Sequence, residues 1–216
     1  RVGQREAAID RLQQWRDAHE ASAAVDSALA ELHLTAGNHA KAVALYTDLV
    51  ERNPDNPAYR NNLAWTLAKQ DKLDAALGHA KKAAELAPDN AGVLDTLGMI
   101  HLKRGHAAEA RKHLAKAADA APDAAEIQLN YAEALIASGE RDKATSILGQ
   151  LADRSLSEDE SRRVERLRAK VQSRPLPPSL RTAGGRPRPR RRSDFLTDHP
   201  PPQSKSDRLS RGAVYR

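Results

Sequence analysis

The chain has 216 residues, of which 40% are apolar and only 3% are aromatic, so alanine and leucine must form most of its core. It contains no cysteine, which excludes disulfides and thiolate chemistry, and no apolar run approaches the ~20 residues of a membrane-spanning helix. The formal charge of +6 is uneven, because residues 173–216 carry 11 Lys/Arg and 3 Asp/Glu while residues 1–172 carry 24 and 26. The basic character therefore gives no reason to expect nucleic-acid binding by residues 1–172.

A step of 34 residues relates the chain to itself. This spacing separates Gly3, Gly37, Asp71, Gly105 and Gly139, and an alanine stands five residues after each of them. A Pro-Asp pair repeats with the same step at Pro54, Pro88 and Pro122. A period of this length is typical of stacked helical units, each of which buries its apolar face against its neighbours. The sequence therefore predicts a repeat protein.

Residues 1–22 are predicted to be the second helix of a repeat whose first helix lies upstream. Val2-Gly3-Gln4 matches in register the turns at Gly37, Gly105 and Gly139, so we expect a turn there and a helix over residues 5–19.

Four complete repeats follow, at 23–56, 57–90, 91–124 and 125–156. Each contains two stretches with apolar residues at helical spacing, separated by the glycine or aspartate of the 34-residue step. Matched positions in the first stretch hold a small residue in every repeat: Ala30, Ala64, Gly98 and Ala132. Two helices approach closely only where one of them presents a small side chain, so we expect these positions in helix–helix contacts.

Residues 157–172 are predicted to form a capping helix. Ser157 and Glu160 have the spacing of a capping box, and the segment carries a single apolar stripe on an otherwise charged helix. From residue 173 the composition changes, because eight of the twelve prolines and the run Arg188-Pro189-Arg190-Arg191-Arg192 fall in 173–216. Few apolar residues and high net charge predict disorder for this tail.

The 34-residue unit resembles the tetratricopeptide repeat (TPR) over residues 1–158. The resemblance implies an all-α fold: a right-handed α-solenoid of antiparallel helix pairs with a C-terminal capping helix and a disordered tail. The chain departs from the repeat's pattern at its tryptophan position, where Asp26, Arg60, Leu94 and Gln128 stand.

A narrower resemblance comes from three runs, Asn61–Trp65, Leu86–Asn90 and Val93–Gly98. They are similar to the last repeats of the TPR proteins of bacterial PEP-CTERM/exosortase exopolysaccharide systems (the PrsT family). This resemblance implies a periplasmic or membrane-associated scaffold, attached through an N-terminal lipoprotein signal upstream of residue 1, that helps to assemble or secrete a polysaccharide. The alternative location is the cytoplasm.

TPR arrays bind partners on the surface formed by their first helices. We predict that another protein, or an extended peptide, binds there through eight residues: Glu31, Asn61, Asn62, Trp65, Asp95, Met99, Asn130 and Glu133. An asparagine amide is both donor and acceptor, so Asn62 and Asn130 suit contact with a peptide backbone; alternatively, Asn62 bonds within its own helix pair. Trp65 and Met99 either form part of a binding patch or pack on each other or on a neighbouring helix.

The sequence predicts no catalytic residue, no metal site and no cofactor. The eight histidines do not show ligand spacing, and no phosphate-binding loop or nucleophile motif is present. The basic tail could attract a polyanion, or it could have no function. The favoured interpretation is a non-enzymatic interaction scaffold, and the alternative is a TPR regulatory or substrate-recognition segment of a larger enzyme.

Overall fold

The computed structural model describes residues 2–20 and 22–173. This part of the chain consists of ten α-helices and contains no strand. The helices are α1 (Val2–Ala18), α2 (Ala23–Thr35), α3 (His39–Arg52), α4 (Pro57–Lys69), α5 (Leu73–Leu86), α6 (Ala91–Lys103), α7 (Ala107–Ala120), α8 (Ala125–Ala137), α9 (Arg141–Ala152) and α10 (Glu158–Gln172). The predicted all-α class is therefore confirmed.

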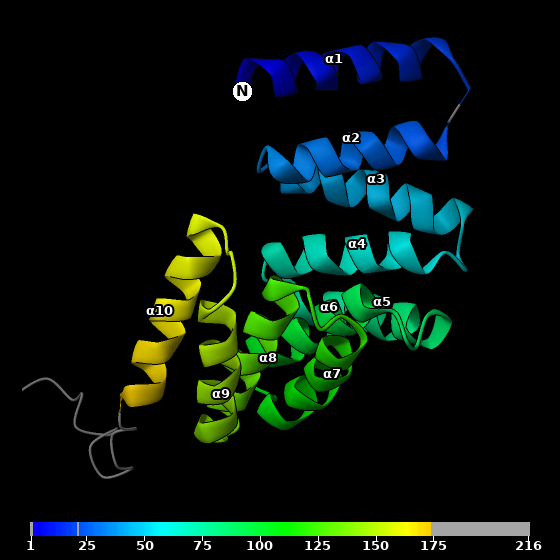
Figure 1. Cartoon of the computed structure of the whole chain (residues 1–216). Helices are drawn as coiled ribbons and strands as arrows, with labels where there is room; N and C mark the ends of the chain where they lie inside the picture. The colour runs from blue at the N-terminus through cyan, green and yellow to red at the C-terminus, as the bar shows by residue number, and fades with distance from the viewer. Residues whose placement is uncertain (1, 21, 174–216) are drawn as a thin grey trace, which may run out of the picture. The chain divides into compact units, whose positions relative to one another are not determined.

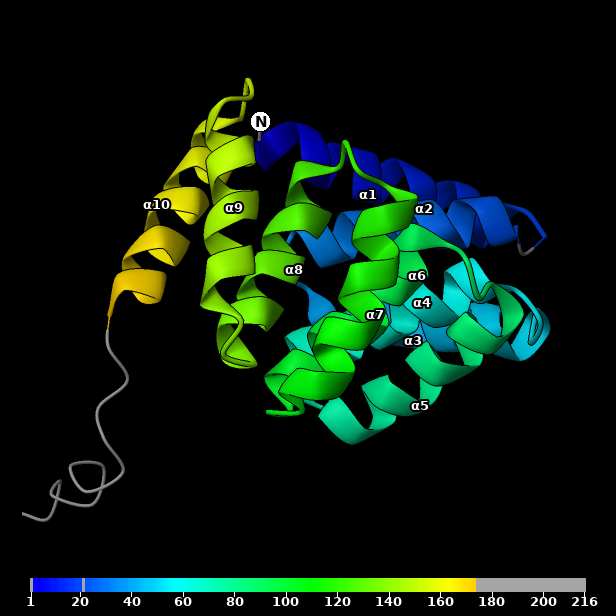
Figure 2. The ribbon, with the colours of Figure 1, turned by 60° about the horizontal axis from the view of Figure 1, so that its bottom comes forward.

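The helices stack in chain order (Figure 1). Four consecutive pairs, α2–α3, α4–α5, α6–α7 and α8–α9, each form one repeat, while α1 packs on α2 and α10 packs against both α8 and α9. Figure 2 shows α8, α9 and α10 side by side at the C-terminal end of the stack. Among the first helices, α4 contacts α6 and α6 contacts α8, and α8 contacts the capping helix α10, so these four helices form one continuous surface.

In each repeat, a residue with left-handed backbone conformation follows the first helix and ends it. Gly37, Asp71, Gly105 and Gly139 have φ of 79°, 59°, 78° and 87°. The next backbone N–H donates to the carbonyl five residues back, as from Asn38 to His33 at 2.8 Å and from His106 to His101 at 2.9 Å. This is the hydrogen bond of a Schellman cap. The predicted turns at Gly37, Gly105 and Gly139 are confirmed, and Asp71 forms the same kind of turn.

The prediction of a turn at Gly3 is wrong, because α1 begins at Val2 and runs through Gly3. A left-handed glycine ends a helix by following its last turn. Gly3 does not have a left-handed φ, and it takes part in the first turn of α1.

The small residues lie at the helix–helix contacts, as expected. Ala30, Ala64 and Ala132 are fully buried, as are the matched alanines of the second helices, Ala42, Ala76, Ala110 and Ala144. Gly98 is the tightest case: a Cβ there would lie 2.5 Å from Leu114 Cγ. Glycine is thus what allows α6 to approach α7 this closely.

The capping helix α10 starts with the predicted capping box. Ser157 Oγ accepts from the Glu160 backbone N–H at 3.3 Å, and Glu160 Oε2 accepts from the Ser157 N–H at 2.8 Å. Val164 and Leu167 are buried against α8 and α9, so one apolar stripe closes the core of the last repeat. The predicted disordered tail lies, from residue 174 on, outside the described residues. None of the ten helices has the length and apolar composition needed to cross a membrane.

Candidate binding groove

The continuous surface of α4, α6, α8 and α10 is called here the groove, and seven of the eight residues predicted for partner binding lie on these helices. Glu31 lies exposed on α2, and Asn61, Asn62 and Trp65 lie half-buried on α4. Asp95 and Met99 are half-buried on α6. On α8, Glu133 is half-buried, whereas Asn130 is only 3% exposed.

The two asparagines of α4 interact weakly inside the chain. The Asn62 side-chain amide donates to the Tyr46 hydroxyl of α3 at 3.4 Å, and the Asn61 amide donates to Asn62 Oδ1 at 3.5 Å. Both distances are long for hydrogen bonds between neutral groups. The bond to Tyr46 joins α4 to the preceding repeat, so it is not the bond within its own helix pair that the alternative hypothesis proposed. It is weak enough to be exchanged for one to a partner.

Trp65 lies outside the apolar clusters that hold the described helices together. The Lys69 ammonium, one turn further along α4, lies 4.3 Å from the centre of the indole ring, which is cation–π geometry. An aromatic ring covered by a flexible lysine can be uncovered at low cost.

Met99 behaves differently. It packs against the small cluster of Ala110, Leu114 and Ala134, which joins α6, α7 and α8. Of the two alternatives for this side chain, the structure favours packing on neighbouring helices. Trp65 and Met99 do not belong to a common apolar cluster in the described chain.

A polar chain crosses the groove at its α10 end. Asn130 Nδ2 donates to Asp95 Oδ1 at 2.8 Å, and Arg163 of α10 donates to Asn130 Oδ1 at 2.5 Å. Arg163 also pairs with Glu133 at 3.2 Å, and Glu133 pairs with Lys170 at 3.3 Å. The buried amide of Asn130 thus links α6, α8 and α10, and both of its ends are occupied within the chain.

Asp95 is a groove carboxyl group whose surroundings shift its pKa strongly. Burial raises its pKa from 3.8 to about 6, and Glu126 adds to the rise, whereas the hydrogen bond from Asn130 and the charge of Arg163 oppose it. The groove therefore contains an acid that titrates near neutrality.

The residues predicted for partner binding do not include Arg163 and Lys170 of the capping helix, although both form ion pairs with Glu133. The signal was available, because Arg163 and Lys170 follow Leu129 and Ile136 of α8 by one more step of 34 residues. The capping helix occupies the place of a fifth first helix and extends the groove.

The extension creates a cleft of about 830 Å³ between α8 and α10. Leu129 and Glu126 line it from α8, and Arg163 and Arg166 line it from α10, together with the first turn of that helix. Within residues 2–20 and 22–173, no group of three or more His, Cys, Asp or Glu is arranged to hold a metal ion.

Stacked antiparallel helix pairs, left-handed turn residues and a polar capping helix define the class of α-solenoid repeat proteins. The particular repeat follows from the sequence: residues 27–91 and residues 101–171 each match a family model described as tetratricopeptide repeat. The chain therefore carries tetratricopeptide repeats.

Solved structures of this fold are similar to the chain at low sequence identity. The TPR protein TTC0263 of Thermus thermophilus aligns with a TM-score of 0.66 and 20% identity, over 78% of this chain and 92% of that one. MamA (residue 41 to the end) from Desulfovibrio magneticus RS-1 aligns at 0.61 and 15%, over 70% and 86%. PilF of Pseudomonas aeruginosa aligns at 0.63 and 21%, over 79% and 81%. No curated protein matches the sequence. These similarities support the fold and do not extend to a function.

Proposed function

We propose that this chain is a non-enzymatic scaffold that binds a protein partner as an extended segment in the groove. The observation that carries the proposal is Trp65, a half-buried indole outside the described apolar clusters, which lies beside the weakly bonded amides of Asn61 and Asn62. A large aromatic ring next to amide donors and acceptors is the composition of a binding hot spot. The repeats also supply a rigid backbone on which such a surface is preorganised.

The α4 part of the groove is the most suitable place for the partner. At the other end, Asn130 and Glu133 are already bonded to the capping helix. A segment that binds next to Trp65 has only to displace Lys69 and one 3.4 Å hydrogen bond. Asn130 and Glu133 then act by holding α10 in place beside the bound segment.

Site-specific photo-crosslinking tests this proposal. A photoreactive phenylalanine analogue is introduced at Trp65, and in a second variant at Lys82, an exposed residue of α5. In cells of the native host we expect one discrete adduct from position 65 and none from position 82. Equal labelling from both positions, or labelling from position 82 alone, would contradict a partner site in the groove.

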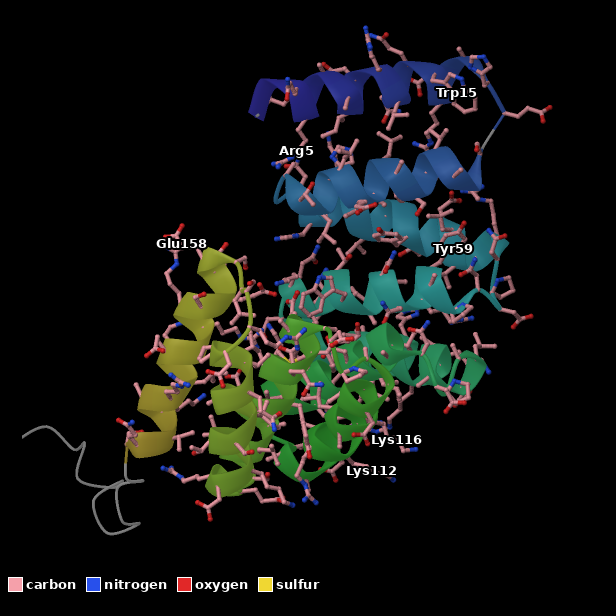
Figure 3. The ribbon with its side chains drawn as sticks, viewed as in Figure 1. Arg5, Trp15, Tyr59, Lys112, Lys116 and Glu158 are labelled. Atoms are coloured by element: carbon pink, nitrogen blue, oxygen red, sulfur yellow. The ribbon has the colours of Figure 1, made fainter. Side chains whose placement is uncertain are left out.

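The chain's two tryptophans provide a matched pair for measuring affinity once the adduct has been identified. Trp65→Ala is expected to weaken binding of that partner at least tenfold, about 1.4 kcal/mol, because truncation of an aromatic hot spot has this size of effect. Trp15→Ala changes the exposed tryptophan of α1 (Figure 3), which lies outside the groove, and should leave affinity unchanged. Urea denaturation of both variants checks that the fold is retained; loss of folding in Trp65→Ala would instead assign the indole to the core.

A role in the bacterial envelope, in exopolysaccharide assembly or secretion, is the finer proposal. It is supported by the resemblance of the runs Asn61–Trp65, Leu86–Asn90 and Val93–Gly98 to the PEP-CTERM-associated TPR proteins. Fractionation of the native host tests it, with recovery in the periplasmic or membrane fraction expected. Recovery in the cytosol, with a crosslinked partner that is a catalytic domain of the same polypeptide, would favour the alternative of a regulatory segment.

A further inference from the structure

Three histidines gather at the corner between α6 and α7, and the proposed function does not use them. His101 lies on α6, His106 in the connecting turn and His113 on α7. The ring centres of His101 and His113 are 5.6 Å apart and their planes differ by 9°, so the two imidazoles are stacked. The ring of His106 lies 5.8 Å from that of His101 at a tilt of 42°.

The stacked pair forms part of the packing between the two helices. His101 is only 7% exposed, and the Nδ1 atoms of both His101 and His113 are buried without a hydrogen-bond partner in the described chain. Within the described chain, no carboxylate accepts a hydrogen bond from either ring, so none stabilises the protonated form in this way. A proton added to either ring therefore places a charge in the interface between α6 and α7.

The third repeat differs from the others in this pairing. The position of His101 is occupied by His33, Leu67 and Leu135 in repeats one, two and four, and the position of His113 by Leu45, His79 and Ile147. Two histidines thus face each other in repeat three, whereas each of the other repeats has at least one aliphatic residue at this contact.

The charges around the pair oppose protonation. Burial is the main cause that lowers the pKa of His101, followed by repulsion from His113 and His106, and by Lys81 of α5. Burial also lowers the pKa of His113, followed by Lys112 and Lys116, which lie on the same helix (Figure 3). Glu109 of α7 acts in the opposite direction on both rings but does not outweigh these effects.

We propose that the stacked pair His101–His113 makes the third repeat acid-sensitive, so that protonation loosens the packing of α6 against α7 before the other helix pairs open. The pair lies inside this contact, because the buried ring of His101 on α6 stacks on the ring of His113 on α7. A charge on either ring therefore has to be accommodated between the two helices.

The direction of the pH dependence follows from proton linkage. Above pH 6.5, the ordinary value for histidine, both rings are neutral in the folded and in the opened repeat, and the packing is intact. Below pH 6.5 the opened repeat takes up protons first, so the equilibrium shifts toward opening until the pH reaches the lowered pKa of the folded state. Each unit of lowering changes the opening equilibrium about tenfold.

The consequence for partner binding rests on the proposed function: α6 also carries Asp95 and Met99, so an opened third repeat would disrupt the groove. The acid sensitivity itself is a property of the free protein. We therefore test it without a partner, so that its failure can be told apart from failure of the groove proposal.

Hydrogen exchange of the full chain at pH 7.5 and 5.5, corrected for the intrinsic exchange rate, measures the opening of each helix. We expect the opening equilibrium of α6 and α7 to rise about tenfold or more at pH 5.5. In His101→Leu/His113→Leu the rise should disappear. Leucine is compatible with both positions, because Leu67, Leu135 and Leu45 occupy them in other repeats. Asp95, which also titrates in this range, is present in both proteins and cancels in the comparison.

His33→Leu is the matched control. It removes a buried histidine at the same repeat position, but one whose matched position on α3 holds Leu45 instead of a second histidine. Its effect should be smaller and confined to α2 and α3. The proposal is overturned if the double variant loses protection in α6 and α7 as strongly as the natural chain does. It is also overturned if the proton resonances of His101 and His113 titrate at the ordinary value of 6.5.

Discussion

Single residues set how closely the helices of a pair approach. At the matched position of the first helices, three repeats have a fully buried alanine and the third has Gly98, whose missing Cβ makes room for Leu114. The sequence identified this position as a contact because it is small in all four repeats. It did not indicate that α6 and α7 are closer than an alanine allows, since that depends on how the facing leucine packs.

Gly98→Ala is therefore expected to lower stability, although alanine is the better helix former. Its Cβ would lie 2.5 Å from Leu114 Cγ and 3.3 Å from the Ala110 carbonyl oxygen, so the helices would have to separate. Overpacking of this kind costs about 1–3 kcal/mol, which exceeds the propensity gain of up to about 1 kcal/mol. Urea denaturation measures the change.

Gly78→Ala serves as its control. Gly78 lies in the interior of α5, and a Cβ there meets no atom within 4 Å. This variant should be stabilised by about 0.5–1 kcal/mol, since only the propensity term remains. Equal stabilisation of both variants would show that α6 and α7 can separate freely, and that Gly98 is not a packing requirement.

At the scale of elements, a buried charged side chain joins neighbouring helices in addition to their apolar contacts. Asp26 of α2 is fully buried and pairs with Arg16 of α1, at 2.8 Å, and with Arg52 of α3. It stands where the repeat's pattern has tryptophan, a departure that the sequence showed but did not explain. The structure supplies the reason, because one carboxylate bridges three consecutive helices.

Asp26→Asn keeps the shape of the side chain and removes its charge. Loss of one member of a buried ion pair is costly, but both arginines are about one-third exposed and retain some hydration. We expect a loss of about 1–3 kcal/mol in urea denaturation. Because repeats interact mainly with their neighbours, hydrogen exchange should accelerate in α1–α3 and remain unchanged in α8–α10.

Asp48→Asn is the matched control for this ion pair. Asp48 pairs with the same Arg52, at 2.6 Å, but its side chain is 47% exposed. An exposed pair contributes under about 1 kcal/mol, so this variant should stay close to the natural chain. If the two variants lost equal stability, the burial of Asp26 would not be what makes its ion pairs important.

On the scale of the whole molecule, the periodicity predicted the helix pairs, their order, their turns and the capping helix, because the helices of every repeat pack in the same way. The contents of the groove were less predictable. Asn130 was expected to face a partner, but it is buried by Arg163, a residue 33 positions later whose side chain reaches back from α10. Such contacts depend on side-chain length and charge, which the repeat pattern does not specify.

Within the α6–α7 pair, the pH dependence of stability is a sum of opposing contributions. The lowered pKa values of His101 and His113 make the protein less stable as the pH falls below 6.5. Asp95, also on α6, acts in the other direction. Its folded-state pKa of about 6 lies above the ordinary 3.8, so between these values the folded state holds a proton that the unfolded state does not. This group therefore adds stability as the pH falls from about 6 to about 4.

Asp95→Asn isolates this contribution, best in the His101→Leu/His113→Leu background, where the opposing effect is absent. An asparagine at position 95 can still accept the hydrogen bond from Asn130, but it carries no charge that burial would destabilise. At pH 7 we expect the variant to be more stable by about 1–2 kcal/mol, because the natural chain must keep a carboxylate ionised in a partly desolvated site. Urea denaturation between pH 4 and pH 7.5 should show this advantage shrinking as the pH falls through about 6, where Asp95 itself becomes neutral. A variant less stable than its parent at pH 7 would contradict this expectation. It would mean that the charge of Asp95 is needed to hold Arg163, and that the polar chain across α6, α8 and α10 fixes the capping helix through ionic interactions.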